Sequence, residues 1–133
     1  MNRFRIAFWA STGLVALAMV ASGVLYLLQT LQGGGEILDN FARLGYPTYV
    51  PALLGIAKLL GALALVAGPI LARFRTLTEW AYAGFTFNLI GATVSHMAAG
   101  DGVAGFAPPL VFLAILMVSY ALWRRGAYHA ARP

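Results

Sequence analysis

The 133-residue sequence contains no cysteine. This absence excludes disulfides, thiol redox chemistry, cysteine-ligated zinc and iron–sulfur clusters within the chain. Charge is also scarce: 10% of the residues are charged, with 4 acidic side chains against 9 Lys and Arg. A soluble domain carries about 25% charged residues to cover its surface. This chain has too few charged residues to form a water-exposed surface, so we expect it to lie in a lipid bilayer.

Hydrophobic residues make up 61% of the sequence and gather in four runs long enough to cross a bilayer. The runs cover residues 6–28, 49–71, 80–98 and 107–123. Because backbone groups in lipid must be hydrogen-bonded within their own segment, each run predicts a helix. We therefore expect a single membrane domain over residues 1–133, an all-α integral membrane protein folded as a four-transmembrane-helix bundle.

A short polar segment, GEILDNFARLGYP, separates the first two runs. Its apolar side chains recur at helical spacing and its charged side chains take the other face, while Gly45 and Pro47 are stop signals. The pattern predicts a short amphipathic helix at the membrane interface between transmembrane helices 1 and 2.

The arginines are distributed unequally between the two sides of a four-span topology. One side receives Arg3, Arg5, Arg73, Arg75, Arg124, Arg125 and Arg132, and the other receives Arg43 with Glu36, Asp39 and Asp101. Cytoplasmic loops carry the excess of Lys and Arg. We therefore predict that both termini are cytoplasmic.

Lys58 is the one lysine inside an apolar run. It lies about 13 Å below the outer end of the second helix, deeper than its side chain reaches. The same outer half should hold a group of other polar side chains, namely Ser22, Tyr26, Gln29, Asn88, Ser95 and His96, with Asp101 in the outer loop. We expect one outward-facing site in which Asp101 or a water-filled pocket compensates the lysine charge.

Each of these residues also has a purely structural interpretation. Lys58 could be a structural pin, His96 an interfacial hydrogen-bonding residue, Asn88 a contact between helices and Asp101 a turn residue. Glu79 ends the motif TLTE, which matches a capping box at the start of the third helix.

Small residues form two stripes that predict close helix packing. The stripes are Ala57, Gly61, Ala64 and Gly68 on the second helix, and Gly84, Asn88, Gly91 and Ser95 on the third. They could pack within one chain or between chains of a homo-oligomer. We expect no bound metal and no nucleotide or nucleic-acid partner. We also expect no haem, because His96 and His129 should lie on opposite sides of the membrane.

The chain resembles small DoxX-like membrane proteins from about Arg5 to Trp123. LGYPTYVPALLGIAKLLGA, EWAYAGF and SHMAAGDGVAGFAPPL carry the likeness. The resemblance implies a four-helix protein of the bacterial inner membrane, linked in some members to quinones or to oxidoreductase complexes. It also marks Lys58, Glu79, His96 and Asp101 as characteristic polar positions, and places Asn88 where many relatives have an aspartate.

The leading functional hypothesis is a quinone-linked redox protein or a membrane subunit of an oxidoreductase complex. Lys58, His96 and Asp101 would be its catalytic residues, and Lys58, Asn88, Ser95, His96 and Tyr26 would bind the quinone. With no flavin or metal motif, electrons would come from a partner subunit. A non-catalytic scaffold, a small oligomeric transporter and a cofactor-free membrane enzyme are the alternatives, so whether the protein is an enzyme stays open.

Overall fold

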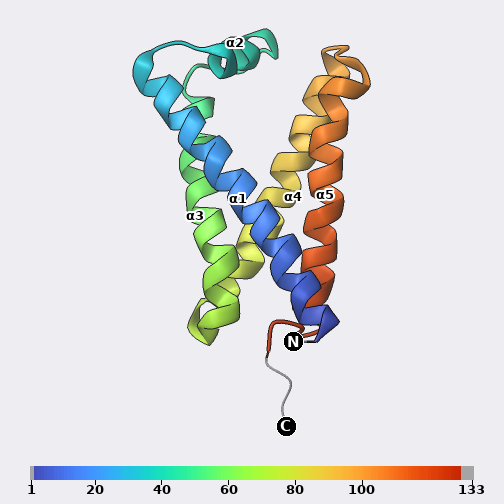
Figure 1. Cartoon of the computed structure of the whole chain (residues 1–133). Helices are drawn as coiled ribbons and strands as arrows, with labels where there is room; N and C mark the ends of the chain where they lie inside the picture. The colour runs from blue at the N-terminus through green and yellow to red at the C-terminus, as the bar shows by residue number, and fades with distance from the viewer. Residues whose placement is uncertain (1, 130–133) are drawn as a thin grey trace.

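The computed structural model describes residues 2–129, so Arg132, which supported the predicted orientation, lies outside the described residues. Within that range the chain is helical and has no strand. Figure 1 shows its elements in order: α1 (Arg3–Gln32), α2 (Glu36–Arg43), α3 (Val50–Ile70), the 3-10 turn η1 (Ala72–Phe74), α4 (Arg75–Ala98) and α5 (Gly102–Arg124).

Three of the long helices, α1, α3 and α5, are long and apolar enough to cross a membrane. The sequence predicted all three, although α5 begins at Gly102, ahead of the predicted start at residue 107. The fourth long helix, α4, has 24 residues but a more polar composition. The predicted all-α class is therefore confirmed, together with three candidate membrane spans.

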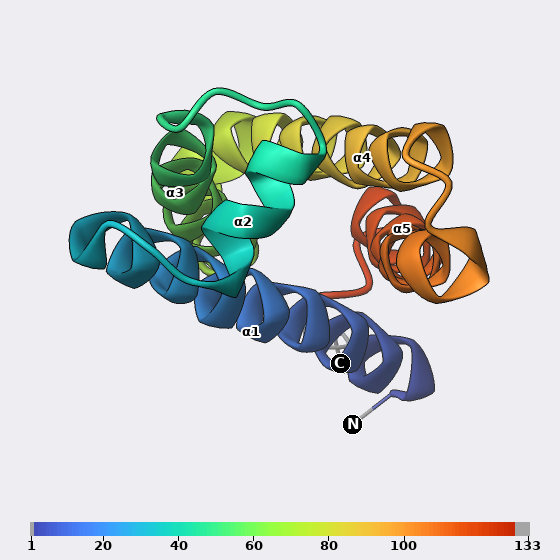
Figure 2. The same cartoon turned by 90° about the horizontal axis from the view of Figure 1, so that it is seen from above.

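The long helices pack in a closed order in which α1 contacts α3 and α5, and α4 contacts α3 and α5. Figure 1 shows α1 crossing the others diagonally, close to α5 near its own start and close to α3 near its end. The α1–α3 pair and the α4–α5 pair separate towards the end that carries α2. Seen from above, α2 lies over the space between them (Figure 2).

The core is densest at the end where α1 begins. Phe8, Val15, Leu65 and Leu116 are fully buried there or towards mid-helix. Polar groups buried among them share partners: the Ser119 hydroxyl lies 2.6 Å from Thr12 Oγ1 and 2.7 Å from Tyr82 Oη. The core at this end of the bundle is therefore well packed, and the cavity with a polar lining lies towards α2.

Two glycines allow the close crossing of α1 and α3. A Cβ added to Gly23 would lie 3.0 Å from the Gly55 carbonyl oxygen, and a Cβ on Gly55 would lie 3.0 Å from the Gly23 oxygen. Side chains at either position would force the two backbones apart, as at other small-residue crossings in membranes. The crossing places the next turn of α3, which carries Lys58, against α1.

Only one of the two predicted small-residue stripes lies in the α3–α4 interface. On α3, Gly61 faces the ring of Phe85 and Gly68 faces Thr78. On α4, Gly84 and Gly91 face open space, with no atom within 4 Å of an added Cβ. The α3 stripe thus packs within the chain, while the glycines of the α4 stripe border cavities.

The predicted TLTE capping box is wrong. The turn η1 leads directly into α4, which begins at Arg75 after Phe74, so Thr76 already lies inside the helix and is not its N-cap. Thr78 instead donates its hydroxyl proton to the Ala64 carbonyl at 2.6 Å, joining α4 to α3. Glu79 accepts a 2.6 Å hydrogen bond from Trp123 Nε1 and joins α4 to α5.

Candidate functional site

A cavity of about 440 Å³ lies beneath α2, between the separated helix pairs. We call it the α2 chamber. Its polar lining comes from α1, α2 and the segment after it, α3 and α4: Ser22, Tyr26, Asn40, Tyr46, Lys58, Asn88, Ser95 and His96. The volume falls within the range of about 300–1,000 Å³ that is usual for small-molecule sites.

Lys58 is the charged group at the bottom of the chamber. Only 7% of its surface is exposed. Its Nζ donates to Ser22 Oγ at 3.2 Å and lies 3.9 Å from the centre of the Tyr26 ring, a cation–π contact. Two neighbours on α1 therefore partner the ammonium group, and both are neutral.

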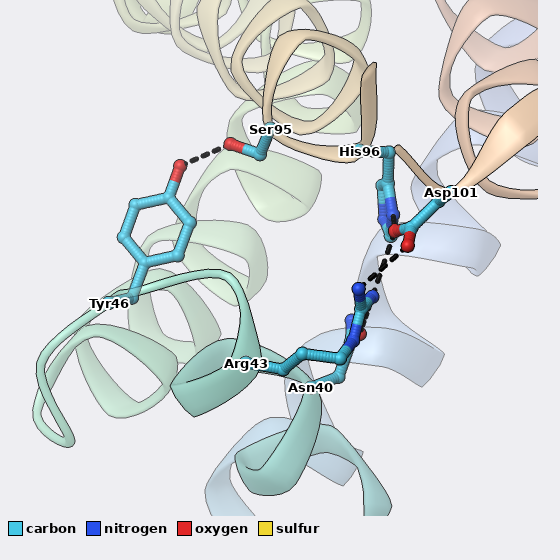
Figure 3. Close-up of polar contacts among 6 residues, drawn as sticks. All are labelled: Asn40, Arg43, Tyr46, Ser95, His96 and Asp101. Atoms are coloured by element: carbon cyan, nitrogen blue, oxygen red, sulfur yellow. Dashed lines mark hydrogen bonds and ion pairs between the residues drawn. The ribbon is translucent and has the colours of Figure 1, made fainter. Parts of the chain in front are cut away.

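The expectation that Asp101 compensates Lys58 is wrong. Asp101, just before α5, accepts two hydrogen bonds from the Arg43 guanidinium, 2.6 Å from Nη1 and 2.8 Å from Nη2 (Figure 3). Its Oδ2 also lies 2.5 Å from His96 Nδ1. The aspartate is too fully engaged with α2 and α4 to serve the lysine.

This pairing keeps the acid charged. The hydrogen bond from Arg43, helped by the one to His96, lowers the pKa of Asp101 to about 2. The carboxylate in turn raises the pKa of the Arg43 guanidinium. With Nδ1 of His96 directed at the carboxylate, Nε2 is the ring nitrogen left to face a ligand in the chamber.

Other contacts fasten α2 and the segment after it over the chamber. Tyr46 Oη lies 2.5 Å from Ser95 Oγ on α4 (Figure 3). The Phe41 ring packs edge-on against Tyr26 of α1, with 5.3 Å between centroids. Gln29 Oε1 accepts a 2.8 Å hydrogen bond from the Ile37 backbone. The amphipathic helix is thus a cover attached to three of the long helices or their ends.

A second cavity of about 680 Å³ runs along the outside of the bundle between α3 and α4. We call it the α3–α4 groove. Apart from Lys58, Asn88 and the Trp80 indole, every residue that lines it is apolar. Leu54, Lys58 and Asn88 line both cavities, so the polar chamber and the apolar groove adjoin at these residues.

Asn88 lies at this junction with its amide available. Its side chain forms no hydrogen bond with any residue in the described range. An amide offers two donors and an acceptor. The chamber therefore presents three groups to a ligand that the fold does not fully occupy: the Lys58 ammonium, the Asn88 amide and His96 Nε2.

The structure brings together most of the residues that the sequence singled out. Tyr26, Lys58, Asn88, Ser95 and His96 all line the chamber, and Asp101 adjoins it through His96. Their catalytic and binding roles stay predictions.

The sequence analysis did not include α2 in the site, although Asn40, Phe41 and Arg43 close it. The available signal was Arg43, the single arginine on its side of the predicted topology. Because the other charged residues on that side are Glu36, Asp39 and Asp101, the single arginine indicated an acidic partner.

The structure gives no support for a metal centre. No group of three or more His, Asp or Glu residues in the range 2–129 could hold a metal ion. His129 lies beside Arg75 at the opposite end of the bundle from His96, with 3.5 Å between His129 Nε2 and the guanidinium.

The fold and site define the class of protein: an all-α membrane protein with a covered polar chamber beside an apolar groove. The family model of the DoxX-like family matches residues 10–119, most of the chain. The chain therefore belongs to the DoxX-like family, and the resemblance is confirmed. Searches of the curated proteins and of the solved structures found no match.

Proposed function

We propose that the protein is a quinone-linked redox protein, or the quinone-binding membrane subunit of an oxidoreductase complex, in a bacterial inner membrane. One observation carries the proposal: a polar chamber around a buried lysine adjoins an apolar groove on the outside of the bundle. A quinone has the same two parts, a head with two carbonyl oxygens and a long apolar tail. The head fits the chamber, and the tail fits the groove.

The chamber residues suit the head group. Lys58 and Asn88 can donate hydrogen bonds to one carbonyl near the groove. His96 can donate from Nε2 to the other on the α4 side when its ring carries a second proton, because Nδ1–H already faces Asp101. A bound quinone would accept two electrons and two protons, and Lys58 and His96 are the groups able to hold and release those protons. Asp101 fixes the orientation of the His96 ring and is a positioning residue.

The electron donor in this proposal is a partner subunit, because the sequence has no cysteine and no flavin or metal motif. The α2 cover would exclude water from the head group, while the groove would admit the tail from the bilayer. Two further residues would complete the wall of the site. Ser95 is held by its hydrogen bond with Tyr46, and the Tyr26 ring contacts the Lys58 ammonium.

The proposal includes a four-span topology with α4 as the remaining span. Its 24 residues would extend about 36 Å, enough to cross a bilayer beside α3 and α5. Figure 1 shows α2 at the opposite end of the bundle from the start of α1. Glu36 and Asp39 belong to α2, whereas Arg3 and Arg5 belong to the first turn of α1. Both termini would then be cytoplasmic.

The topology can be tested directly because the chain has no native cysteine. Single cysteines in place of Asp39 and Arg73 should differ in intact cells. We expect the first to react with a membrane-impermeant maleimide and the second only after permeabilisation. The reverse pattern would overturn the orientation.

The quinone proposal is tested by what the protein retains on purification. Wild type and Lys58→Met, which removes the charge at similar volume, are purified in mild detergent and their extracts examined for quinone by absorbance and mass. We expect near-stoichiometric quinone in the wild type and a large loss from a folded variant. No quinone in the wild type, with a variant that unfolds or sheds a partner, would instead favour the scaffold.

A further inference from the structure

Lys58 is a buried cation without an anionic partner. It is 93% buried, and its contacts are the Ser22 hydroxyl and the Tyr26 ring. Neither carries a charge to balance the ammonium. A buried charge that is left unpaired is costly, so such groups either have a partner of opposite charge or lose their own charge.

The chain has no acid left to supply that partner. The sequence contains 4 acidic residues, all within the described range, and none forms an ion pair with Lys58. Asp101 is bound by Arg43 and His96, and Glu79 by Trp123 at the other end of the bundle. The remaining two, on α2, line a separate surface pocket.

The surroundings of Lys58 define the shape of the missing partner. Lys58 and Asn88 both line the α2 chamber and the α3–α4 groove, so one small oxyanion where the two cavities adjoin has an ammonium and a free amide in its surroundings. The α3–α4 groove begins at the same residues and continues to Leu71, about 20 Å further along α3. Its lining there is apolar, as an extended hydrocarbon chain requires.

We infer that this site binds a single-chain amphiphile whose head carries one negative charge, as a fatty-acid carboxylate does. The head oxygens accept hydrogen bonds from Lys58 Nζ and the Asn88 amide, and the chain lies in the α3–α4 groove. One unpaired cation matches one negative charge, and one groove matches one chain. The inference goes beyond the proposed redox function, needs no electron transfer, and makes the amphiphile a competitor of quinone for the α2 chamber.

Equilibrium binding of labelled palmitate tests the inference. The protein is placed in nanodiscs of neutral phosphatidylcholine at about pH 7, which is well above the ordinary pKa of a carboxylate. Two glycine variants distinguish binding in the cavities from partitioning of palmitate into the bilayer. Both positions have room for a larger side chain, because neither has an atom within 4 Å of an added Cβ. Gly91→Leu fills the chamber and Gly84→Leu fills the groove, while Gly13→Leu adds the same side chain on α1 away from both cavities.

We expect wild type and Gly13→Leu to bind palmitate equally, and the two cavity-filling variants to lose binding above the lipid background. Lys58→Met should weaken binding by at least about tenfold, because truncating one partner of a buried charge pair leaves the other unpaired. Lys58→Arg should retain most of the affinity. Should Lys58→Met fail to fold, the comparison of Gly91→Leu with Gly13→Leu still decides.

Competitors identify the ligand class. Unlabelled palmitate should displace the label, and hexadecanol, which has the same chain without charge, should not. Equal competition by hexadecanol, or unchanged binding in folded Lys58→Met, would overturn the inference. Phosphatidylglycerol competing as well as palmitate would also overturn it, because the site would then hold an ordinary two-chain lipid. Quinone retention is measured in a separate experiment, so the quinone proposal and the amphiphile inference can each fail without the other.

Discussion

The α1–α3 crossing makes a sharp prediction about how the site is positioned. Gly23 meets α3 with no room for a side chain: an added Cβ would lie 3.0 Å from the Gly55 oxygen and 3.2 Å from Lys58 Cβ. All three of the nearest atoms belong to α3. Two of them lie in its backbone or next to it, so neither can move alone. The substitution Gly23→Ala must therefore push the two helices apart.

The size of the effect follows from the packing. Inserting a methyl group into a fully packed contact costs about 1–3 kcal/mol. For a chain of this length, each kcal/mol corresponds to about 4 °C in Tm, so Gly23→Ala should melt about 4–12 °C below Gly13→Ala, which gains the same helix propensity. Gly13→Ala adds the same methyl group to α1, where no atom lies within 4 Å, and should melt at or above wild type.

Thermal unfolding in mild detergent, followed by circular dichroism, measures both variants. Because Ser22 precedes Gly23 and supports Lys58, ligand retention should fall in Gly23→Ala at temperatures where the protein is still folded. Equal melting temperatures for Gly23→Ala and Gly13→Ala would refute the close crossing and the positioning of Lys58 that depends on it.

Two further predictions concern the well-packed end and the cover. Ser119→Ala leaves the hydroxyls of Thr12 and Tyr82 buried without their shared partner, which should cost about 1–3 kcal/mol in thermal or denaturant unfolding; an unchanged stability would contradict the buried network. The contact between Asp101 and Arg43 depends on pH, because the pKa of this aspartate is lowered from 3.8 to about 2. Its stabilising contribution is fully present above about pH 4 and is lost as the pH falls towards 2. Spin labels on α2 and on the α4–α5 turn should therefore keep their distance from pH 7 to about 5 and separate only below about 4; separation near neutral pH would contradict the assignment.

Helix positions and depths could be predicted from the sequence because the membrane and the helix rise fix them. An apolar run in lipid must be helical, and each residue advances about 1.5 Å along the axis. That arithmetic was enough to place Lys58, Ser22 and Tyr26 at one level, where the structure brings them into contact. The amphipathic pattern of α2 was equally direct, because charged and apolar side chains separate cleanly on its two faces.

Choice of partners could not be predicted, because it depends on how the helices turn about their axes and on where loops fold back. Asp101 lies at the end of the fold towards which the Lys58 side chain leans, but it pairs with Arg43, which α2 carries across the mouth of the chamber. The TLTE motif has the spacing of a capping box, yet the turn before α4 moves the helix start upstream and frees Glu79 to meet Trp123. Local patterns of this kind give way to tertiary contacts.

The most direct test of the account is to locate a ligand in the fold. The protein would be co-crystallised with a bromine-substituted short-chain quinone, and the bromine found by anomalous scattering. The account predicts a bromine peak in the α2 chamber between Lys58, Asn88 and His96, lost in Gly91→Leu and retained in Gly13→Leu. A peak confined to the outer surface of the helices, with the chamber unchanged by the quinone, would contradict it.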